Sequence, residues 1–203
     1  MRDVTQVIAG SGSLYLAETS NQSAVDFLAA IQARDGDDVP TEDEWLNAGF
    51  DGIGYTDDGV EFDHANTFKE ITVDEELDSV DQLLTGQKTE VKLKMAQASL
   101  QNLGRCIAGS TFIATGDKNI LRFGSPTPDQ IKEFVIGFQG PAPSGDANRV
   151  IGIWRTKNLA AVAHKYQRTD KVMFEVNFTG LADSSMPKGQ RIGFMVDFAQ
   201  AGS

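Results

Sequence analysis

Apolar and polar residues alternate along most of this chain with a period of two, which is typical of strands that have one solvated face. The clearest run covers residues 88–95, where Thr89, Val91, Leu93 and Met95 alternate with Lys88, Glu90, Lys92 and Lys94. The same alternation predicts further strands near residues 13–17, 134–138, 150–155, 172–179 and 192–198. The chain is therefore expected to be mainly β.

Turn-forming residues separate several of these runs. Asp57-Asp58-Gly59 lies between two short strand-like segments, Thr85-Gly86-Gln87 precedes the clearest strand, and residues 141–146 separate two others. Short strands with turns at this spacing favour an antiparallel β-sandwich or barrel. Sharp changes of composition and internal repeats are both absent, so we expect a single domain over residues 1–203.

Helix patterns are few. Residues 97–108 place Leu100, Leu103 and Ile107 on one face, and Gly109 provides a stop, although Gly104 weakens the pattern. Residues 24–33 also place apolar side chains on one side, which is compatible with a helix or with part of a mobile loop. We expect one helix packed on the sheet, with residues 18–48 forming a loop or arm.

Charge is distributed very unevenly. The chain carries 29 Asp and Glu against 18 Lys and Arg, a formal net charge of −11, and residues 35–81 hold 17 of the acids against Lys69 alone. Such a balance argues against a DNA-binding surface, because phosphate contacts require concentrated Lys and Arg. The segment is either a solvated acidic loop or an acidic arm with a function.

Residues with catalytic or metal-binding chemistry do not form recognisable motifs. His64 and His164 are far apart in the sequence, and Cys106 is the single cysteine, so an intrachain disulfide cannot form. The Asp-rich turns lack the alternating ligands of a calcium loop. We therefore expect a protein that is not an enzyme and has no metal, no cofactor and no catalytic residue.

Neither a signal peptide nor a membrane-spanning run is recognisable, so folding in a cytoplasm is expected.

Residues 49–104 carry a more specific signal. The segment Gly49-Phe50-Asp51-Gly52-Ile53-Gly54-Tyr55-Thr56-Asp57-Asp58-Gly59-Val60-Glu61-Phe62 resembles one that is typical of the major tail (tail tube) proteins of long-tailed, siphovirus-like bacteriophages. The continuation follows the same order, with an acidic strand at Glu70–Asp74, a Thr-Gly turn at residues 85–86, an alternating strand at 91–96 and a helix at 99–103. Residues 18–48 do not match the family pattern.

This resemblance implies a β-sandwich subunit that joins itself into hexameric rings, which stack into a tube for genome delivery. The implied partners are the same chain together with tail-tip, tape-measure and tail-terminator proteins. Viral DNA would pass through without specific binding, and no membrane insertion is expected. The implied location is the virion tail, assembled in the host bacterial cytoplasm.

The acidic segment suggests how such a tube would avoid holding DNA, since carboxylates keep a wall repulsive to phosphate. The lumen-facing candidates share one strand face if the strand continues far enough: Glu70, Thr72, Asp74 and Glu76. The alternative is that this face meets external solvent.

Contacts between subunits would use aromatic and charged residues. The candidates are Trp45, Phe50, Tyr55, Asp57, Asp58, Phe62, Lys88, Lys92, Lys94, Arg149 and Arg155. The four aromatic residues in this set anchor the acidic segment either to its own core or to a neighbouring subunit. A second function remains open, a receptor- or carbohydrate-binding virion module with Trp45, Tyr55 and Trp154 as stacking residues.

Overall fold

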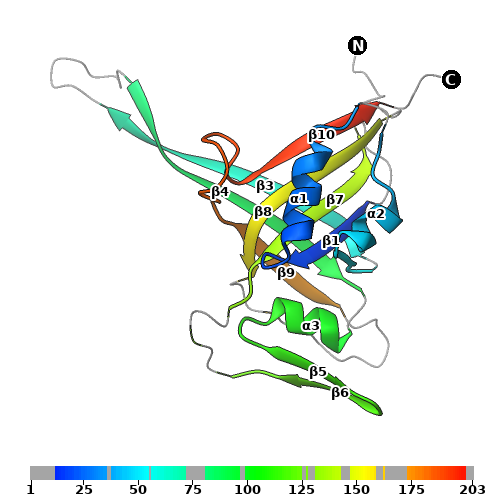
Figure 1. Cartoon of the computed structure of the whole chain (residues 1–203). Coiled ribbons are helices and arrows are strands. Elements are labelled where there is room, and N and C mark those ends of the chain that lie inside the picture. Colours follow the sequence, from blue (N-terminus) through cyan, green and yellow to red (C-terminus); the bar gives the residue numbers. More distant parts are fainter. Residues whose placement is uncertain are drawn as a thin grey trace.

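The computed structural model describes residues 12–35, 38–54, 56–71, 81–96, 99–124, 127, 131–142, 147–158, 162 and 173–199, except for the side chains of Asp57, Asp58 and Ala199. Most of its strands join one antiparallel sheet of eight strands, in the order β2-β1-β7-β8-β9-β4-β3, and β10 pairs with β8 (Figure 1). The strands of this sheet are β1 (Ser13–Glu18), β2 (Asp51–Gly52), β3 (Thr56–Ile71), β4 (Asp81–Met95), β7 (Phe134–Pro141), β8 (Ala147–Asn158), β9 (Phe174–Gly180) and β10 (Gly193–Ala199). The predicted mainly β, antiparallel fold is confirmed.

The sheet folds over on itself. Three strands separate β3 from β7 in the sheet order, which in a flat sheet would place them roughly 19 Å apart. Instead, the rings of Phe62 on β3 and Phe138 on β7 lie 5.3 Å apart between centroids. The larger core cluster, which includes Leu16, Val91 and Phe178, is built from strands of both halves of the sheet. The two halves therefore pack face to face, as in a sandwich.

The sequence pattern predicts strands with one solvated face, whereas both faces of the central strands are covered. Leu14 and Leu16 of β1 point into the core between the two halves of the sheet. Tyr15 and Ala17, which alternate with them, belong to a second cluster on the opposite face. A strand buried on both faces becomes a continuous apolar run, and β1 has this pattern.

Two helices cover the second face. Helix α1 (Gln22–Ile31) buries Leu28 and Ile31, and helix α2 (Glu42–Asn47) buries Trp45. Residues 18–48 were expected to form a loop or arm, but they contain these two helices instead. Their apolar side chains occur at helical spacing and fill the second face of the sheet. Residues 24–33, for which the sequence left a helix and a mobile loop open, form most of α1, whereas α2 was not predicted.

Helix α3 (Leu100–Cys106) forms a small unit with the hairpin β5 (Thr111–Thr115) and β6 (Lys118–Arg122) (Figure 1). The side chain of Ser99 caps the helix by accepting a hydrogen bond from the backbone N–H of Asn102. The helix is shorter than the predicted 97–108, and the β5–β6 hairpin was not predicted. Among the described residues three helices are present, rather than the single packed helix expected.

Two predicted turns are wrong, because both sequences lie inside long strands. Asp57-Asp58-Gly59 forms a bulge in β3, where the register with β4 shifts and Gly59 has a φ of 79°. Thr85 is the extra residue of a second bulge, in β4. A bulge uses the same glycine and small polar residues as a turn but only bends the strand. The connection at residues 141–146 does separate β7 from β8, as predicted.

Candidate assembly surface

Strands β3 and β4 continue well beyond the sheet as a two-stranded ribbon (Figure 1). We call residues 63–71 of β3 and 81–89 of β4 the arm. None of the side chains in these two ranges is buried, and Phe62 at the foot of the arm is half-buried against Phe138. At about 3.3 Å per residue, the arm extends roughly 30 Å from its foot to Ile71. The sequence analysis placed a turn at residues 85–87, inside the β4 half of this arm, and so missed it.

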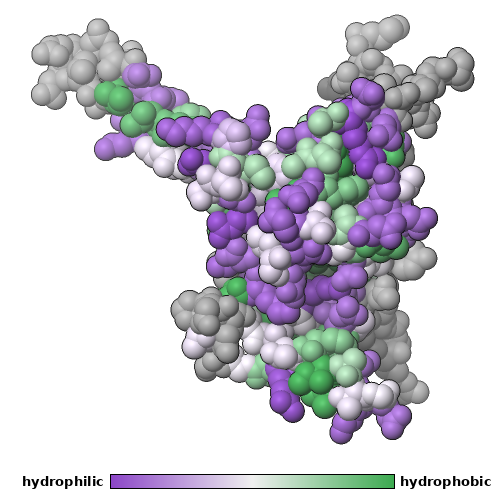
Figure 2. Space-filling view, viewed as in Figure 1, coloured by the Kyte–Doolittle hydropathy of each residue, from purple (hydrophilic) through white to green (hydrophobic). Residues whose placement is uncertain are grey.

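Large apolar side chains are exposed at the outer part of the arm, where Figure 2 shows hydrophobic atoms on a projecting element. Phe68, Ile71, Leu83 and Leu84 are between 42% and 57% exposed. An isolated two-stranded ribbon is marginally stable in water, and exposed apolar groups on a strand edge favour association. These residues are the strongest sign of a contact surface in the described part of the chain.

The strand register assigns these four side chains to two opposite faces. Phe68 lies directly opposite Leu84, so the two share one face, whereas Leu83 lies opposite Lys69 and shares the other face with Ile71. We call the first of these the inner face, because it continues from Phe62 and the core, and the second the outer face. The end of the arm is therefore apolar on both sides.

A groove of about 710 Å³ runs along the inner face at the foot of the arm. One wall is formed by Phe62 at the foot of the arm together with His64 and Leu84 of the arm, and the other is formed by β10 and the segment before it. Phe194 and Met195 contribute apolar surface to this second wall, and Met195 is 60% exposed. Lys188 and Arg191 line the same groove. Its size lies within the range of ~300–1,000 Å³ that is usual for binding pockets.

Alternating Lys and carboxylate side chains cover the outer face near the foot of the arm. Lys92 lies 3.1 Å from Glu61 and 3.3 Å from Asp63, and Lys88 lies 3.0 Å from Glu90. These pairs are exposed, so each contributes little to stability. They leave a polar surface on which each of these two lysines already has a carboxylate partner.

The predicted basic contact residues all have partners within their own chain. Besides Lys88 and Lys92, Lys94 lies 3.8 Å from Glu175. Arg149 donates two 2.7 Å bonds to Asp197, and Arg155 donates to both carboxylate oxygens of Glu133. These pairs form because the strands bring the side chains side by side. Pairing across subunits is therefore not needed to neutralise these cations, and such a role stays an untested prediction.

Of the predicted aromatic contact residues, two lie in the core and Phe62 lies at the foot of the arm. Trp45 is 0% exposed, stacks on Tyr15 at 4.8 Å and donates from Nε1 to Gln139 Oε1 at 2.8 Å, and Phe50 is also buried. Both therefore anchor the acidic segment to its own core. Tyr55 and the side chains of Asp57 and Asp58 lie outside the described part. Contact of any of these residues with a neighbour remains a prediction that a single chain does not test.

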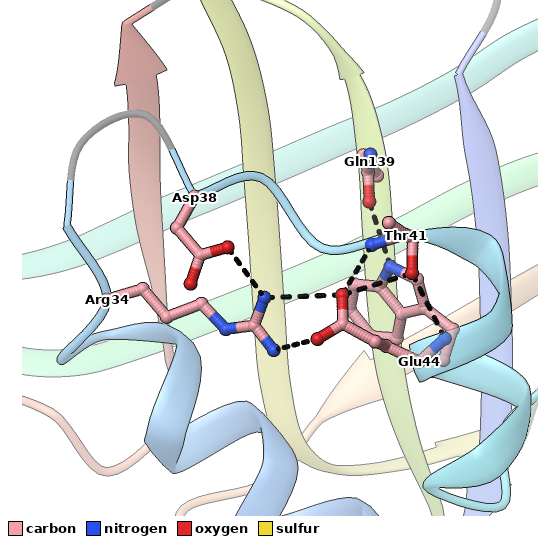
Figure 3. Close-up of polar contacts among 6 residues, drawn as sticks. Arg34, Asp38, Thr41, Glu44 and Gln139 are labelled. Carbon is pink, nitrogen blue, oxygen red and sulfur yellow. Dashed lines mark hydrogen bonds and ion pairs between the residues drawn. The ribbon is translucent and has the colours of Figure 1, made fainter.

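A charged cluster fixes α2 against α1 (Figure 3). Arg34 donates to Glu44 at 2.8 Å and lies 3.7 Å from Asp38, while the backbone N–H of Thr41 donates to Glu44 at 2.8 Å. The hydrogen bond from Arg34, helped by the one from Thr41, lowers the pKa of Glu44 to about 2. The cluster orients α2 so that Trp45 enters the core.

Of the predicted lumen residues, Glu70 is described and exposed. It lies opposite Gln82, on the inner face of the arm and two residues beyond Phe68. Thr72, Asp74 and Glu76 lie outside the described residues. Whether this run faces a lumen is untested.

The histidines and the cysteine that were considered for catalysis are His64, His164 and Cys106. His64 Nδ1 lies 2.8 Å from Thr89 Oγ1 across the arm, and His164 is outside the described residues. Burial raises the pKa of the Cys106 thiol to about 12, so little reactive thiolate is present near neutral pH. The described ranges contain no group of three or more His, Cys, Asp and Glu side chains that could hold a metal ion.

None of the helices described is long and apolar enough to span a membrane.

Comparison with known proteins gives little information on the role of this chain. Neither a known protein-family profile nor a curated protein matches the sequence. Among solved structures, a chain described as "Virion of native gene transfer agent (GTA) particle" is similar to this one with a TM-score of 0.36 and 11% sequence identity. The match covers 66% of this chain and 85% of that chain. A similarity of this size does not assign a role to this protein.

The groove and the exposed apolar residues of the arm were both missed at the level of sequence. A signal for the arm was present, since Phe68, Ile71, Leu83 and Leu84 are apolar residues in or beside a very acidic segment. No local signal could reveal the groove, because Met195 approaches the foot of the arm only through the pairing of β8 with β10.

Proposed function

We propose that this protein is a structural, non-enzymatic virion protein, the subunit of a phage tail tube that assembles from stacked hexameric rings. The sequence resemblance at residues 49–104 supports the proposal, and the mainly β antiparallel fold is compatible with it. The proposed partners are other copies of the chain and the tail-tip, tape-measure and tail-terminator proteins.

A single structural observation carries the proposal, namely a ribbon that projects from a folded body with apolar side chains on both faces. A subunit that works alone would not benefit from exposing Phe68 and Leu83 on such a ribbon, because strand edges and apolar groups promote association. In a repeating assembly the same exposure is useful, since every copy can cover the arm of a neighbour. The feature therefore favours a self-assembling structural protein.

The charge of the chain supports a conduit for DNA. A wall that does not hold a passing polyanion needs carboxylates or paired cations rather than free Lys and Arg. Glu70, Thr72, Asp74 and Glu76 are the proposed lumen residues. Duplex DNA would pass this surface without specific binding, in a virion tail that is assembled in the bacterial cytoplasm.

Negative-stain electron microscopy of the purified full chain tests the function directly. We expect rings or tubes on concentration, or after addition of a tail-tip nucleus. Tubes with six subunits per ring would support the proposal. Monodisperse monomer at high concentration, even in the presence of the nucleus, would overturn it.

Charge reversal tests the lumen assignment. In Glu70→Lys/Asp74→Lys tubes, we expect retention of duplex DNA, with a log–log salt slope of about −0.9 for each phosphate that a new lysine neutralises. A matched control, Glu42→Lys/Asp43→Lys, places the same charges on α2. Tubes of the Glu70→Lys/Asp74→Lys variant that release DNA as freely as the wild type would remove these residues from the lumen.

The alternative function is a receptor- or carbohydrate-binding virion module. A ring that stacks on a sugar must present its face to solvent, whereas Trp45 and Trp154 are at most 1% exposed. Trp154 also donates from Nε1 to the backbone oxygen of Gln190 at 2.8 Å, inside the body of the protein. These contacts weigh against two of its three candidate stacking residues. Tryptophan fluorescence that is unchanged by added sugars would agree with this conclusion.

A further inference from the structure

We draw no further inference here: the strongest candidate, the groove of about 710 Å³ between the foot of the arm and β10, carries none, because nothing in the described part of the chain shows what covers its apolar side chains.

Discussion

At the scale of single residues, Gly137 of β7 shows how closely the helices pack on the sheet. A Cβ at this position would lie 2.2 Å from Cζ3 of Trp45 and 2.5 Å from Cη2. The indole cannot retreat, because it stacks on Tyr15 and packs edge-on against Phe50. This glycine is therefore needed for space rather than for an unusual backbone angle.

We predict that Gly137→Ala destabilises the chain by about 1–3 kcal/mol, because the methyl group overpacks the site of Trp45. For a chain of this length, the melting temperature should fall by roughly 2–4 °C per kcal/mol. Differential scanning calorimetry provides the measurement. Gly52→Ala is the control, since a Cβ there has no neighbour within 4 Å. Equal melting temperatures for the two variants would contradict the proposed packing.

The Glu44 carboxylate gives a prediction on pH dependence. The folded pKa of Glu44 is about 2, below its ordinary value of ~4.3, so its ionised form is favoured by folding. Its stabilisation is fully present above about pH 4.5 and is lost as the pH falls towards 2. Because the side chain is partly exposed, we expect Glu44→Gln to cost roughly 0.5–1 kcal/mol at pH 6.

Thermal melts of Glu44→Gln and the wild type between pH 6 and pH 2 measure this effect. The difference between them should shrink as the pH falls through this window. Glu42→Gln, which removes a carboxylate from the same helical turn but leaves the capping bonds of Glu44 and Thr41, should show no such trend. A difference that stays constant down to pH 2 would rule out the Arg34–Glu44 contact as its cause.

At the scale of elements, the arm is separable from the body. None of the side chains in residues 65–71 and 81–87 is buried, whereas the core residues of β4 begin at Val91. Ala65 lies opposite Lys88, so the two strands can be joined at that pair by a short turn. The body should therefore fold without the outer part of the arm.

We predict that replacing residues 66–87 by Asn-Gly, a favoured two-residue hairpin turn, changes the melting temperature by only a few degrees and abolishes assembly. Calorimetry and electron microscopy measure the two effects. Leu46→Ser, an exposed apolar substitution on α2, serves as the control that should still assemble. Normal assembly of the shortened chain would show that the arm has no part in it.

At the scale of the whole molecule, the net charge of −11 makes copies repel one another. The basic residues that sequence analysis assigned to contacts between subunits already have partners within the chain, so intersubunit attraction must come chiefly from apolar contact. Salt weakens repulsion between exposed charges, with a Debye length of about 10 Å at 0.1 M.

Assembly should therefore become more favourable as salt rises from about 20 to 300 mM, because repulsion between acidic subunits is screened. Light scattering of the purified chain at fixed concentration gives the measurement. A decrease of assembly with salt would indicate that ion pairs across subunits dominate, as the sequence alone had suggested for Lys88, Lys92 and Arg149.

Sequence periodicity identified most of the large sheet. It predicted the strands around Leu93, Ile136 and Val176 because alternation reports directly on which face of a strand is buried. The distribution of charge located an acidic segment before β4. The search for motifs assigned no catalytic role to any residue. The sequence did not distinguish a bulge from a turn at Gly59 and Thr85, since both use the same residues.

What only the tertiary structure decided is how these strands meet. Trp45 became a core residue because two helices cover the second face of the sheet, and the arm became visible only when β3 and β4 were seen to stay paired beyond the body. The groove beside Met195 depends on strands far apart in the sequence. Local pattern records the burial of a residue, whereas a surface for a second molecule is formed by long-range pairing that leaves no local pattern.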